Sequence, residues 1–285
     1  MAETIGNFKV LAELGKGAHS TIYLVRRESD QRQFALKMVP IADKEQMKYL
    51  EQAQLEFRVG QMLNHPNLVK ILALETQRDW LFRVRKVHLL IEYVAGKTLD
   101  QSIRLSTPWL VQIFAKIAAG LVHMHRRGVY HADLKPNNII LSKAGDVKII
   151  DYGLAWIKGE PKDRVQGTPE YMAPEQSKQT LVNERTDIYN FGATMYRLTT
   201  QHLPPSTVAA PNSPAINAKL FRDLLKPVQE YAPRMPKALC ELIHHCLEYE
   251  PKKRPERVSE VQDELNALVE KLVKSDDDRL EAIGW

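Results

Sequence analysis

The sequence predicts an α+β fold built from a strand-rich first part and a helical second part. Short apolar or alternating runs, separated by turn residues, fill the chain up to residue 94, and this pattern is typical of strands. Longer runs of helical period follow Thr98. With 285 residues and 44% hydrophobic content, the chain is long enough to bury a substantial core.

The first part, residues 1–94, is expected to hold a five-stranded antiparallel sheet and one main helix. The strand runs read FKVLAEL, STIYLVRR, QFALKMV, LVKILAL and VHLLIEYV. Between the third and fourth runs, residues 44–63 show a helical pattern. Pro66 follows and disfavours helix at the residue before it, so the helix should end there.

The second part, residues 95–275, is expected to be mostly helical. Its first helix, TPWLVQIFAKIAAGLVHMHRRG, has Pro108 where a first turn accepts proline and Gly128 where a helix ends. The runs NIILS and VKIID, joined by the turn-like KAGD, predict a hairpin. Residues 276–285 carry three aspartates and are expected to form an acidic, solvated tail after the last helix.

Charge and composition narrow the class of protein. The 40 basic and 35 acidic residues are interspersed, which argues against a nucleic-acid partner despite the net charge of +5. No apolar run is long enough to span a membrane, and the start MAETIGNFKV lacks the features of a signal peptide. We therefore expect a cytoplasmic protein with no membrane partner.

The two cysteines, Cys240 and Cys246, are expected to be buried thiols. They lie six residues apart in a helical segment, so they point to different faces. Together with His244 and His245 they could form a metal site by helical spacing, but no second ligand pair supports one. Surface histidines explain the pattern better.

A glycine-containing loop, LGKGAHSTIYLV at residues 14–25, lies between two predicted strands. Gly15 and Gly17 would let the backbone approach phosphates, although Ser20 stands at the third position of the usual glycine pattern. An ordinary hairpin explains two such glycines about as well. The strand that follows the loop argues against a dinucleotide fold, which needs a helix there.

Two further positions, Lys37 and Glu56, carry charge that a phosphate-binding site could use. Lys37 lies on the third predicted strand, where neighbours would bury its stem. A buried ammonium needs a carboxylate, and Glu56 on the following helix is one, although Glu51 also lies nearby. A lone strand lysine at a solvated edge is the alternative.

The segment HADLKPNN, residues 131–138, groups the polar residues most densely. Asp133 can accept a hydroxyl proton, and Lys135 can neutralise a phosphoryl group in transfer. Asn138 and Asp151, the latter in the triplet DYG, offer the oxygen ligands that Mg²⁺ prefers.

These motifs together resemble the protein kinase domain of the serine/threonine type, over residues 8–272. They occur in the family's order and continue with GTPEYMAPE at 167–175, DIYNFG at 187–192 and the arginine of PKKRP. The resemblance implies a bilobal fold, and it implies a buried ion pair between Arg254 and Glu175.

The resemblance also implies site residues. Asp133, Lys135, Lys37, Glu56 and Thr168 would be catalytic, and Asn138 and Asp151 would hold Mg²⁺, with Mn²⁺ as an alternative. ATP would contact Leu14, Gly15, Lys16, Gly17, Ala18, Ser20, Ile22, Ala35, Lys37, Ile91, Glu92, Val94 and Ile140.

Two departures from the family pattern bear on control. Ala132 stands where many kinases carry an arginine that binds a phosphate on the activation loop, which places the chain in a non-RD subgroup, with HAD in place of HRD. The loop itself, residues 154–166, contains no serine, threonine or tyrosine. We therefore expect activity that is not controlled by phosphorylation of this loop.

Two other segments are unusual for the family. Gly60 replaces a bulky apolar residue on the helix that carries Glu56, which predicts a looser helix in need of a ligand or partner, with Tyr152 filling part of the gap. Residues 76–86, TQRDWLFRVRK, form a long connection that mixes Trp80 and Phe82 with four basic residues. It would either dock a regulatory protein partner or be a plain hairpin extension.

The function expected from the resemblance is transfer of the γ-phosphoryl group of ATP to serine or threonine hydroxyls of protein substrates. A pseudokinase, which keeps the fold as a nucleotide-binding scaffold or interaction module, is the alternative. The presence of Lys37, Glu56, Asp133, Asn138 and Asp151 disfavours it, because degraded kinases commonly lack at least one. A small-molecule kinase is disfavoured by GTPEYMAPE, which resembles a protein-substrate platform.

Overall fold

The computed structural model describes residues 4–17, 19–101, 105–161, 165–178, 182–208 and 216–282, with side chains described up to Val273. Contacts divide the chain into two compact units. The first holds the chain up to Ala95 together with Ile150–Ala155, and the second holds Gly96–Ile149 and the chain from Trp156 onward. The segment that contains Asp151 therefore belongs to the first unit. A single division of the chain after residue 94 would have placed it in the second.

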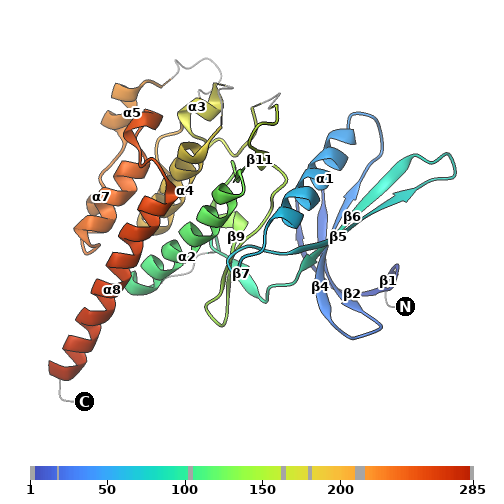
Figure 1. Ribbon diagram of the computed structural model, residues 1–285, viewed down its shortest axis with the longest axis horizontal. Coiled ribbons are helices and arrows are strands. Elements are labelled where there is room, and N and C mark those ends of the chain that lie inside the picture. The colour runs from blue at the N-terminus through green and yellow to red at the C-terminus, as the bar shows by residue number, and fades with distance from the viewer. Residues whose placement is uncertain are drawn as a thin grey trace. The chain divides into compact units, whose positions relative to one another are not determined.

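The first unit is an antiparallel sheet in the order β1-β2-β3-β4-β6-β5 (Figure 1). Its strands are β1 Thr4–Ile5, β2 Phe8–Lys16, β3 Thr21–Arg27, β4 Gln33–Pro40, β5 Ile71–Arg78 and β6 Val84–Glu92. The five predicted strands are all present. The sixth, β1, is only two residues long and too short to show an alternating pattern.

One helix, α1 at Met47–Met62, lies on this sheet and confirms the predicted helix at 44–63 (Figure 1). Its apolar side chains Leu50 and Ala53 are buried against Val39, Ile41 and Val87 of the strand region. Burial of this apolar surface stabilises the layer of helix on sheet. Glu56 is also buried on this helix. A buried carboxylate needs a cation or a hydrogen-bond donor beside it.

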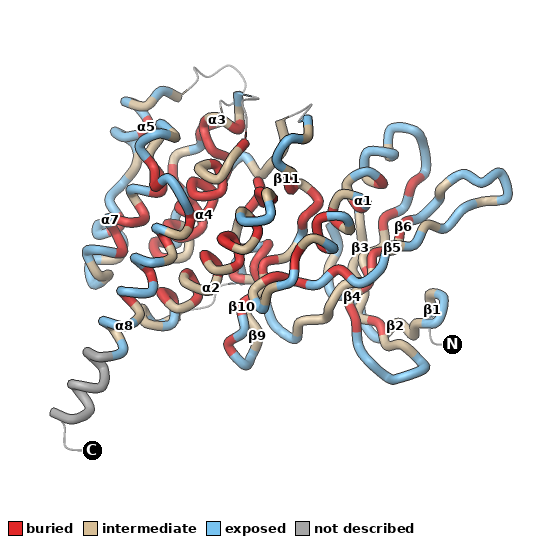
Figure 2. The backbone as a smooth tube through the Cα atoms, viewed as in Figure 1, coloured by how far each residue is buried: buried red, intermediate tan, exposed pale blue. Residues whose placement is uncertain are grey.

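The second unit is mainly helical, as predicted. Its helices are α2 Thr107–Arg126, α3 Pro174–Ser177, α4 Glu184–Thr200, α5 Ala218–Leu224, α6 Val228–Tyr231, α7 Lys237–Cys246 and α8 Val258–Ala282, with 3₁₀ turns at Pro136–Asn138 and Pro251–Lys253. Figure 2 shows buried residues along much of α4 and along one side of α2. Their buried aromatic residues Phe114 and Phe191 meet edge to face, with ring centroids 6.2 Å apart.

Short strands complete the second unit. The predicted hairpin is confirmed as β9 Ile139–Ser142 and β10 Val147–Ile149, with Gly145 at φ 84° in the turn between them. The sequence reading missed β7 Gly96–Thr98, which pairs with β9, and the pair β8 Val129–Tyr130 with β11 Trp156–Ile157. Strands of two or three residues are too short for periodicity to reveal.

Two expectations about the C-terminal region need correction. Helix α8 continues through the three aspartates to Ala282, so they lie within the helix and not in a tail after it. His244 is not a plain surface residue either, since its Nε2 atom lies 3.1 Å from the backbone N–H of Val228 and accepts a hydrogen bond from it. Cys240 and Cys246 are both buried, as expected.

Among the described residues there is neither a membrane-spanning helix nor a cluster of metal-ligating side chains. No helix there combines the length and apolar character needed to cross a bilayer. Within the same ranges, no group of three or more His, Cys, Asp or Glu side chains is placed to hold a metal ion.

Candidate active site

Lys37 lies on one face of the first unit's sheet with the apolar residues predicted to surround a nucleotide. Gly15 pairs with Ile22 across β2 and β3, and Ile22 pairs with Lys37 across β3 and β4. Ala35, two residues before Lys37, pairs with Ile91 on β6. Directly paired residues share a face, as do residues two apart, so these side chains line one surface.

The Lys37 ammonium is held by two carboxylates. Its Nζ atom lies 2.7 Å from Glu56 Oε2 and 3.4 Å from Asp151 Oδ1. The Glu56 side chain is 2% exposed, whereas Glu51 is exposed to solvent, so Glu56 is the partner of the lysine as predicted. Breaking such a buried pair from either side is strongly destabilising, because the other charge stays buried.

The two carboxylates keep the Lys37 ammonium charged. Burial alone lowers the pKa of Lys37, but Asp151 and Glu56 raise it above its ordinary value. Burial raises the pKa of Glu56 above its ordinary value, and the charge of Lys37 opposes that shift. Lys37 therefore remains a cation at neutral pH, ready to bind an anion.

Gly60 does not leave the gap that the sequence suggested. A Cβ atom at Gly60 would lie 2.4 Å from Ile71 Cγ1 and 2.5 Å from Ile71 Cβ, because β5 packs directly against α1 at this point. Tyr152 is fully buried, and its hydroxyl donates to the Val69 carbonyl at 3.0 Å. Glycine at 60 thus permits close packing, and the expected loose helix is not what the contacts indicate.

The glycine loop joins β2 to β3 by a tight turn. The Gly17 N–H donates to the Ser20 carbonyl at 2.8 Å, while no atom lies within 4 Å of where a Cβ of Gly15 would be. Lys16 ends β2, and Leu14 is 45% exposed. Ala18 lies outside the described residues. The open space beside Gly15 is compatible with a bound phosphate.

At the other edge of this face, the chain leaves β6 through Glu92 and Val94. The Glu92 N–H donates to the Lys70 carbonyl at 2.9 Å, so that donor is already used within the unit. Both residues are half-buried, as is Ile140 on β9 of the second unit.

In the second unit, Asp133 is the centre of a hydrogen-bonded network. Its Oδ1 atom accepts from the Thr168 N–H at 2.7 Å, and its Oδ2 atom lies 2.9 Å from Lys135 Nζ. Lys135 also donates to the Thr168 hydroxyl, and the Asn138 amide nitrogen donates to the Asp133 carbonyl at 2.9 Å. The four residues predicted here to act together are therefore in contact, and Asp133 is only 7% exposed.

Asp187 on helix α4 binds the backbone of the HADLKPNN segment. The Asp187 carboxylate accepts from the His131 N–H at 2.8 Å and from the Ala132 N–H at 2.7 Å. His125 on α2 lies with Nε2 2.7 Å from Asp187 and with Nδ1 3.1 Å from Glu184 Oε1. Sequence reasoning quoted DIYNFG as a landmark but missed the roles of His125 and Glu184, which no local motif marks.

His125, Asp187 and Glu184 shift one another's pKa. Burial alone lowers the pKa of His125, but Asp187 and Glu184 raise it to about 9. Burial alone raises the pKa of Asp187, but the hydrogen bond from His125 brings it below its ordinary value. The imidazolium thus keeps the buried carboxylate ionised at neutral pH.

Ala132 occupies an apolar cluster with Tyr130, Trp156 and Val182. Its φ of 61° is rare for a residue with a side chain, and the two backbone contacts to Asp187 and Gln176 hold it there. Trp156, from the expected activation loop, stacks on Tyr130 with centroids 5.7 Å apart. An arginine at 132 would bring a charge into this apolar cluster.

Gln176 ties the same loop to the segment at a second point. Its side-chain nitrogen donates to the Ala132 carbonyl at 2.6 Å and to the Gln166 carbonyl at 2.9 Å. Contacts of residues 162–164, within the loop, lie outside the described residues. Strand pairing, stacking and an amide therefore hold the described ends of the loop.

The ion pair between Arg254 and Glu175 is confirmed. The two guanidinium NH₂ groups lie 2.8 and 2.9 Å from the two carboxylate oxygens of Glu175. The remaining N–H groups donate to the carbonyls of Arg185, Tyr249 and Glu248. The side chain of Arg254 is 0% exposed, so all five of its donors are satisfied inside the protein.

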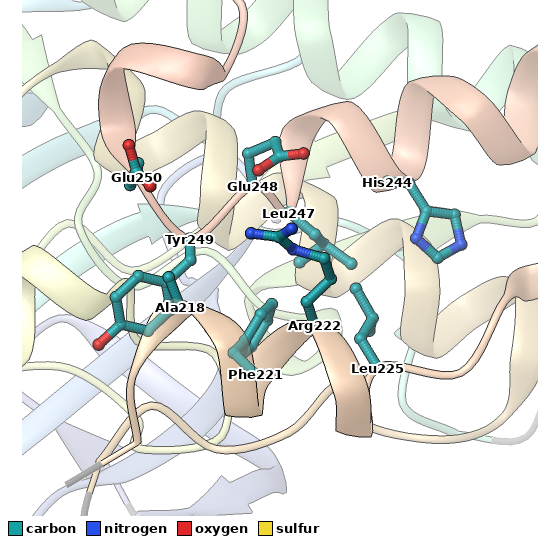
Figure 3. Close-up of a pocket in the computed structure, with 9 residues that line it drawn as sticks. All are labelled: Ala218, Phe221, Arg222, Leu225, His244, Leu247, Glu248, Tyr249 and Glu250. Atoms are coloured by element: carbon teal, nitrogen blue, oxygen red, sulfur yellow. The ribbon is translucent and has the colours of Figure 1, made fainter.

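A separate pocket lies in the second unit, between α5, the end of α7 and the chain that follows it (Figure 3). Phe221, Leu225 and Leu247 supply its apolar lining, and Arg222, Glu248 and Glu250 supply charge. It contains none of the residues predicted to bind ATP or to catalyse a reaction.

Comparison with known proteins identifies the class. The description "protein kinase domain" belongs to the family that matches residues 8–272, and the chain therefore belongs to that family. Its antiparallel sheet with one helix, followed by a helical unit, is the fold expected of such a domain.

Several curated relatives are serine/threonine-protein kinases by name. A probable serine/threonine-protein kinase of Clostridium acetobutylicum is 27% identical over 279 residues, which cover 95% of this chain and 41% of that protein. The kinase PrkC of Bacillus subtilis is 27% identical over 207 residues, 70% of this chain and 31% of its own length. Pkn2 of Myxococcus xanthus is 29% identical over 286 residues, 92% of this chain and 32% of its own length. The chain thus spans less than half the length of these relatives.

Proposed function

We propose that the protein is a serine/threonine protein kinase that transfers the γ-phosphoryl group of ATP to protein hydroxyls. The network around Asp133 is the observation that carries this proposal. A buried carboxylate is held by the Thr168 N–H and the Lys135 ammonium, which fixes its orientation toward an incoming group. The serine/threonine-protein kinases among the relatives support the choice of substrate hydroxyl.

The groups of the second unit would act on the hydroxyl and the transferred phosphoryl. Asp133 would orient the substrate hydroxyl and accept its proton. Lys135, 2.9 Å from Asp133 Oδ2, would neutralise charge that develops on the phosphoryl oxygens. Thr168 positions both, through its N–H and its hydroxyl.

In the first unit, Lys37 would bind the α and β phosphates of the same nucleotide, and Glu56 would keep the ammonium oriented. Family membership supports assigning both sets of residues to one ATP. The adenine ring would lie against Ile22, Ala35 and Ile91, whose side chains share a sheet face with Lys37. Leu14, Lys16, Ser20, Val94 and Ile140 remain proposed contacts.

Asn138 and Asp151 would hold a divalent cation, which would neutralise phosphate charge when bound. The Asn138 amide nitrogen is used by Asp133, which leaves its oxygen as the atom suited to a metal. The Asp151 side chain is 46% exposed and can reach a ligand. Oxygen donors of this kind fit Mg²⁺, and Mn²⁺ accepts the same ligands.

We also propose that activation-loop phosphorylation does not control the enzyme. Ala132 offers no guanidinium to a phosphate, and the loop carries no hydroxyl between 154 and 166. The apolar cluster of Tyr130, Ala132, Trp156 and Val182 and the amide of Gln176 would do what the missing salt bridge does in other kinases. The chain would then be non-RD in mechanism as well as in sequence.

Incubation with labelled ATP, Mg²⁺ and a general protein substrate tests the proposal. Asp133→Asn and Lys37→Met should each lower transfer by about 10² to 10³-fold, because they remove the base and a phosphate-binding charge. The exposed residues Asp223→Asn and Lys219→Met are matched controls and should leave transfer unchanged. Label on tyrosine instead of serine or threonine would contradict the substrate class.

A pseudokinase is the second candidate, and the same experiment separates the two. Thermal stabilisation by ATP together with no transfer above the Asp133→Asn background would favour the scaffold. The ion pair between Lys37 and Glu56, at 2.7 Å, favours the active kinase over the pseudokinase. A cytoplasmic location and a regulatory protein partner remain further expectations for the proposed kinase.

A further inference from the structure

The turn between β5 and β6 presents large apolar side chains to solvent. Trp80 is 85% exposed, Phe82 is 79% exposed and Leu81 between them is 43% exposed. Figure 2 shows the end of this hairpin as an almost continuous exposed segment. A single exposed apolar residue is ordinary, but three in succession at an apex form a patch that calls for a contact.

The turn is held rigid by Asp79. Its Oδ1 atom accepts from the Leu81 N–H at 2.8 Å and the Arg83 N–H at 3.0 Å, and its Oδ2 atom lies 2.9 Å from Arg85 Nε. The Phe82 N–H donates to the Asp79 carbonyl at 3.0 Å. The apex is therefore pre-formed, which lowers the entropy lost when a partner binds it.

Phe82 has a φ of 60°, in the left-handed region that a bulky residue rarely adopts. A turn that had only to reverse the chain would favour glycine or asparagine there. Phenylalanine at this position destabilises the turn, and its exposed side chain gains little stabilisation from burial. A contact with a partner outside the chain would account for a phenylalanine at this position.

Positive charge surrounds the apex. Residues 76–86 contain four basic residues and one acid. The acid, Asp79, is paired with Arg85, which also donates to the Ala42 carbonyl at 3.3 Å. Arg83 is exposed just before β6, Lys86 is exposed on β6, and Arg78 is exposed at the end of β5. The partner should therefore be anionic at its surface and apolar beneath.

We propose that the β5–β6 tip, defined as residues 78–86, inserts into the interface of an anionic membrane. The apex is convex, and three side chains bury far less than the roughly 800 Å² that each partner loses in a stable protein interface. Tryptophan and phenylalanine favour the boundary between headgroups and acyl chains. The flanking basic residues would lie at the level of acidic headgroups.

This proposal revises the expectation of no membrane partner, which rested on the lack of a spanning segment. A loop that enters only the interface needs no such segment. It also stands apart from the kinase activity, since none of the tip residues belongs to the proposed site.

Sedimentation with lipid vesicles tests the proposal. The wild-type protein should bind vesicles of phosphatidylcholine mixed with phosphatidylserine and not vesicles of phosphatidylcholine alone. Trp80→Ala combined with Phe82→Ala should weaken binding at least about ten-fold, since both anchors are lost. Arg83→Glu combined with Lys86→Glu should weaken it by at least about 25-fold, because each basic residue near such a surface contributes about five-fold.

Matched variants control for exposure and net charge. Leu220→Ala with Leu224→Ala removes two exposed apolar side chains elsewhere, 40% and 50% exposed, and should leave binding unchanged. Lys219→Glu with Arg234→Glu matches the charge change and should have a smaller effect. Trp80→Phe should keep binding but abolish the blue shift of tryptophan emission that wild type shows on vesicles.

Several outcomes would overturn the proposal. They are equal binding to both vesicle types, equal loss in the matched variants, and a blue shift that survives Trp80→Phe. Tip-dependent binding to a single-stranded oligonucleotide or an acidic protein, without vesicle binding, would replace it. Transfer to a soluble substrate, measured in the same preparations, should be unchanged in every tip variant, which keeps this test separate from that of the kinase proposal.

Discussion

Gly60 shows how a single absent side chain can set the distance between two elements. In most helix interiors, glycine to alanine stabilises by about 1 kcal/mol. Here the added Cβ would lie 2.4 Å from Ile71 Cγ1. Overpacking of this kind usually costs about 1 to 3 kcal/mol.

We therefore predict that Gly60→Ala lowers the unfolding free energy by up to about 2 kcal/mol, measured by chemical denaturation. Gln54→Ala, at an exposed position of the same helix, serves as the control and should be close to neutral. Ile71 is buried, so Ile71→Ala is itself destabilising, but it should cost less in the Gly60→Ala background than in the wild type, because the clash is relieved. A stabilised Gly60→Ala protein would show that the contact with Ile71 relaxes at little cost.

At the residue scale, the sequence predicted which charged side chains pair better than it predicted which residues pack against each other. Glu56 was favoured over Glu51 by its distance from the segment HPN at residues 65–67, and the structure places Glu56 beside Lys37. Gly60 could not be interpreted, because its role depends on Ile71, which is eleven positions later in the chain and on a different element. Close packing between elements leaves no mark in a local pattern.

At the scale of elements, His125 joins helix α2 to α4 and, through Asp187, to the HADLKPNN segment. Its ordinary pKa of 6.5 is raised to about 9 in the folded protein. A raised folded pKa means that the stabilisation is complete below pH 6.5 and is lost as the pH rises through about 9. Tyr130, 5.2 Å from the imidazole ring, is the other side chain described against it.

We predict that the wild-type unfolding free energy falls by about 3 kcal/mol between these pH values through this group. In His125→Gln that part of the pH dependence should be missing. Urea unfolding at a series of pH values measures it, with the exposed His245→Gln as the control. A His125→Gln profile parallel to wild type would show that the imidazole is not the titrating group.

The activation loop gives a second prediction at this scale. Trp156→Ala should lower kcat several-fold, because the loop loses its stacking on Tyr130. Trp156→Phe keeps an aromatic ring and should retain most of the activity. Trp109→Ala, at a 45% exposed position, controls for the loss of a tryptophan. If Trp156→Ala were folded and fully active, the cluster would not position the loop.

Elements of sufficient length were predicted well. The five long strands, α1, α2 and the β9–β10 hairpin all follow from periodicity and turn residues. The strands β7, β8 and β11 have two or three residues each and exist because of their pairing partners. The helical character of the three aspartates in α8 was also missed, since local charge favours solvent exposure but does not decide between helix and coil.

At the scale of the whole molecule, the sequence gives no serine, threonine or tyrosine to the activation loop. We predict that phosphatase treatment changes transfer by less than about two-fold, because no phosphate orders that loop. Mass spectrometry after autophosphorylation should place every site outside residues 154–166. A large loss of activity that tracks dephosphorylation of Thr168, just after the loop, would contradict this prediction.

The motif order predicted the family, and a family match over residues 8–272 agrees with it. The candidate site was predictable because chemistry restricts residue types there: a base, a cation and oxygen ligands. What could not be predicted is how those groups are supported. Glu184, His125 and Gln176 act through other residues, so their identity follows from the three-dimensional arrangement and not from the reaction.

The way Asp187 holds the HADLKPNN segment has a consequence for how such a chain can evolve. The carboxylate accepts hydrogen bonds from backbone N–H groups, which every residue except proline supplies, so these two bonds do not require particular side chains at 131 and 132. Position 132 can then lose an arginine and gain an alanine without disturbing the base one residue later. A lineage could discard one means of regulation and acquire another while its chemistry stayed intact.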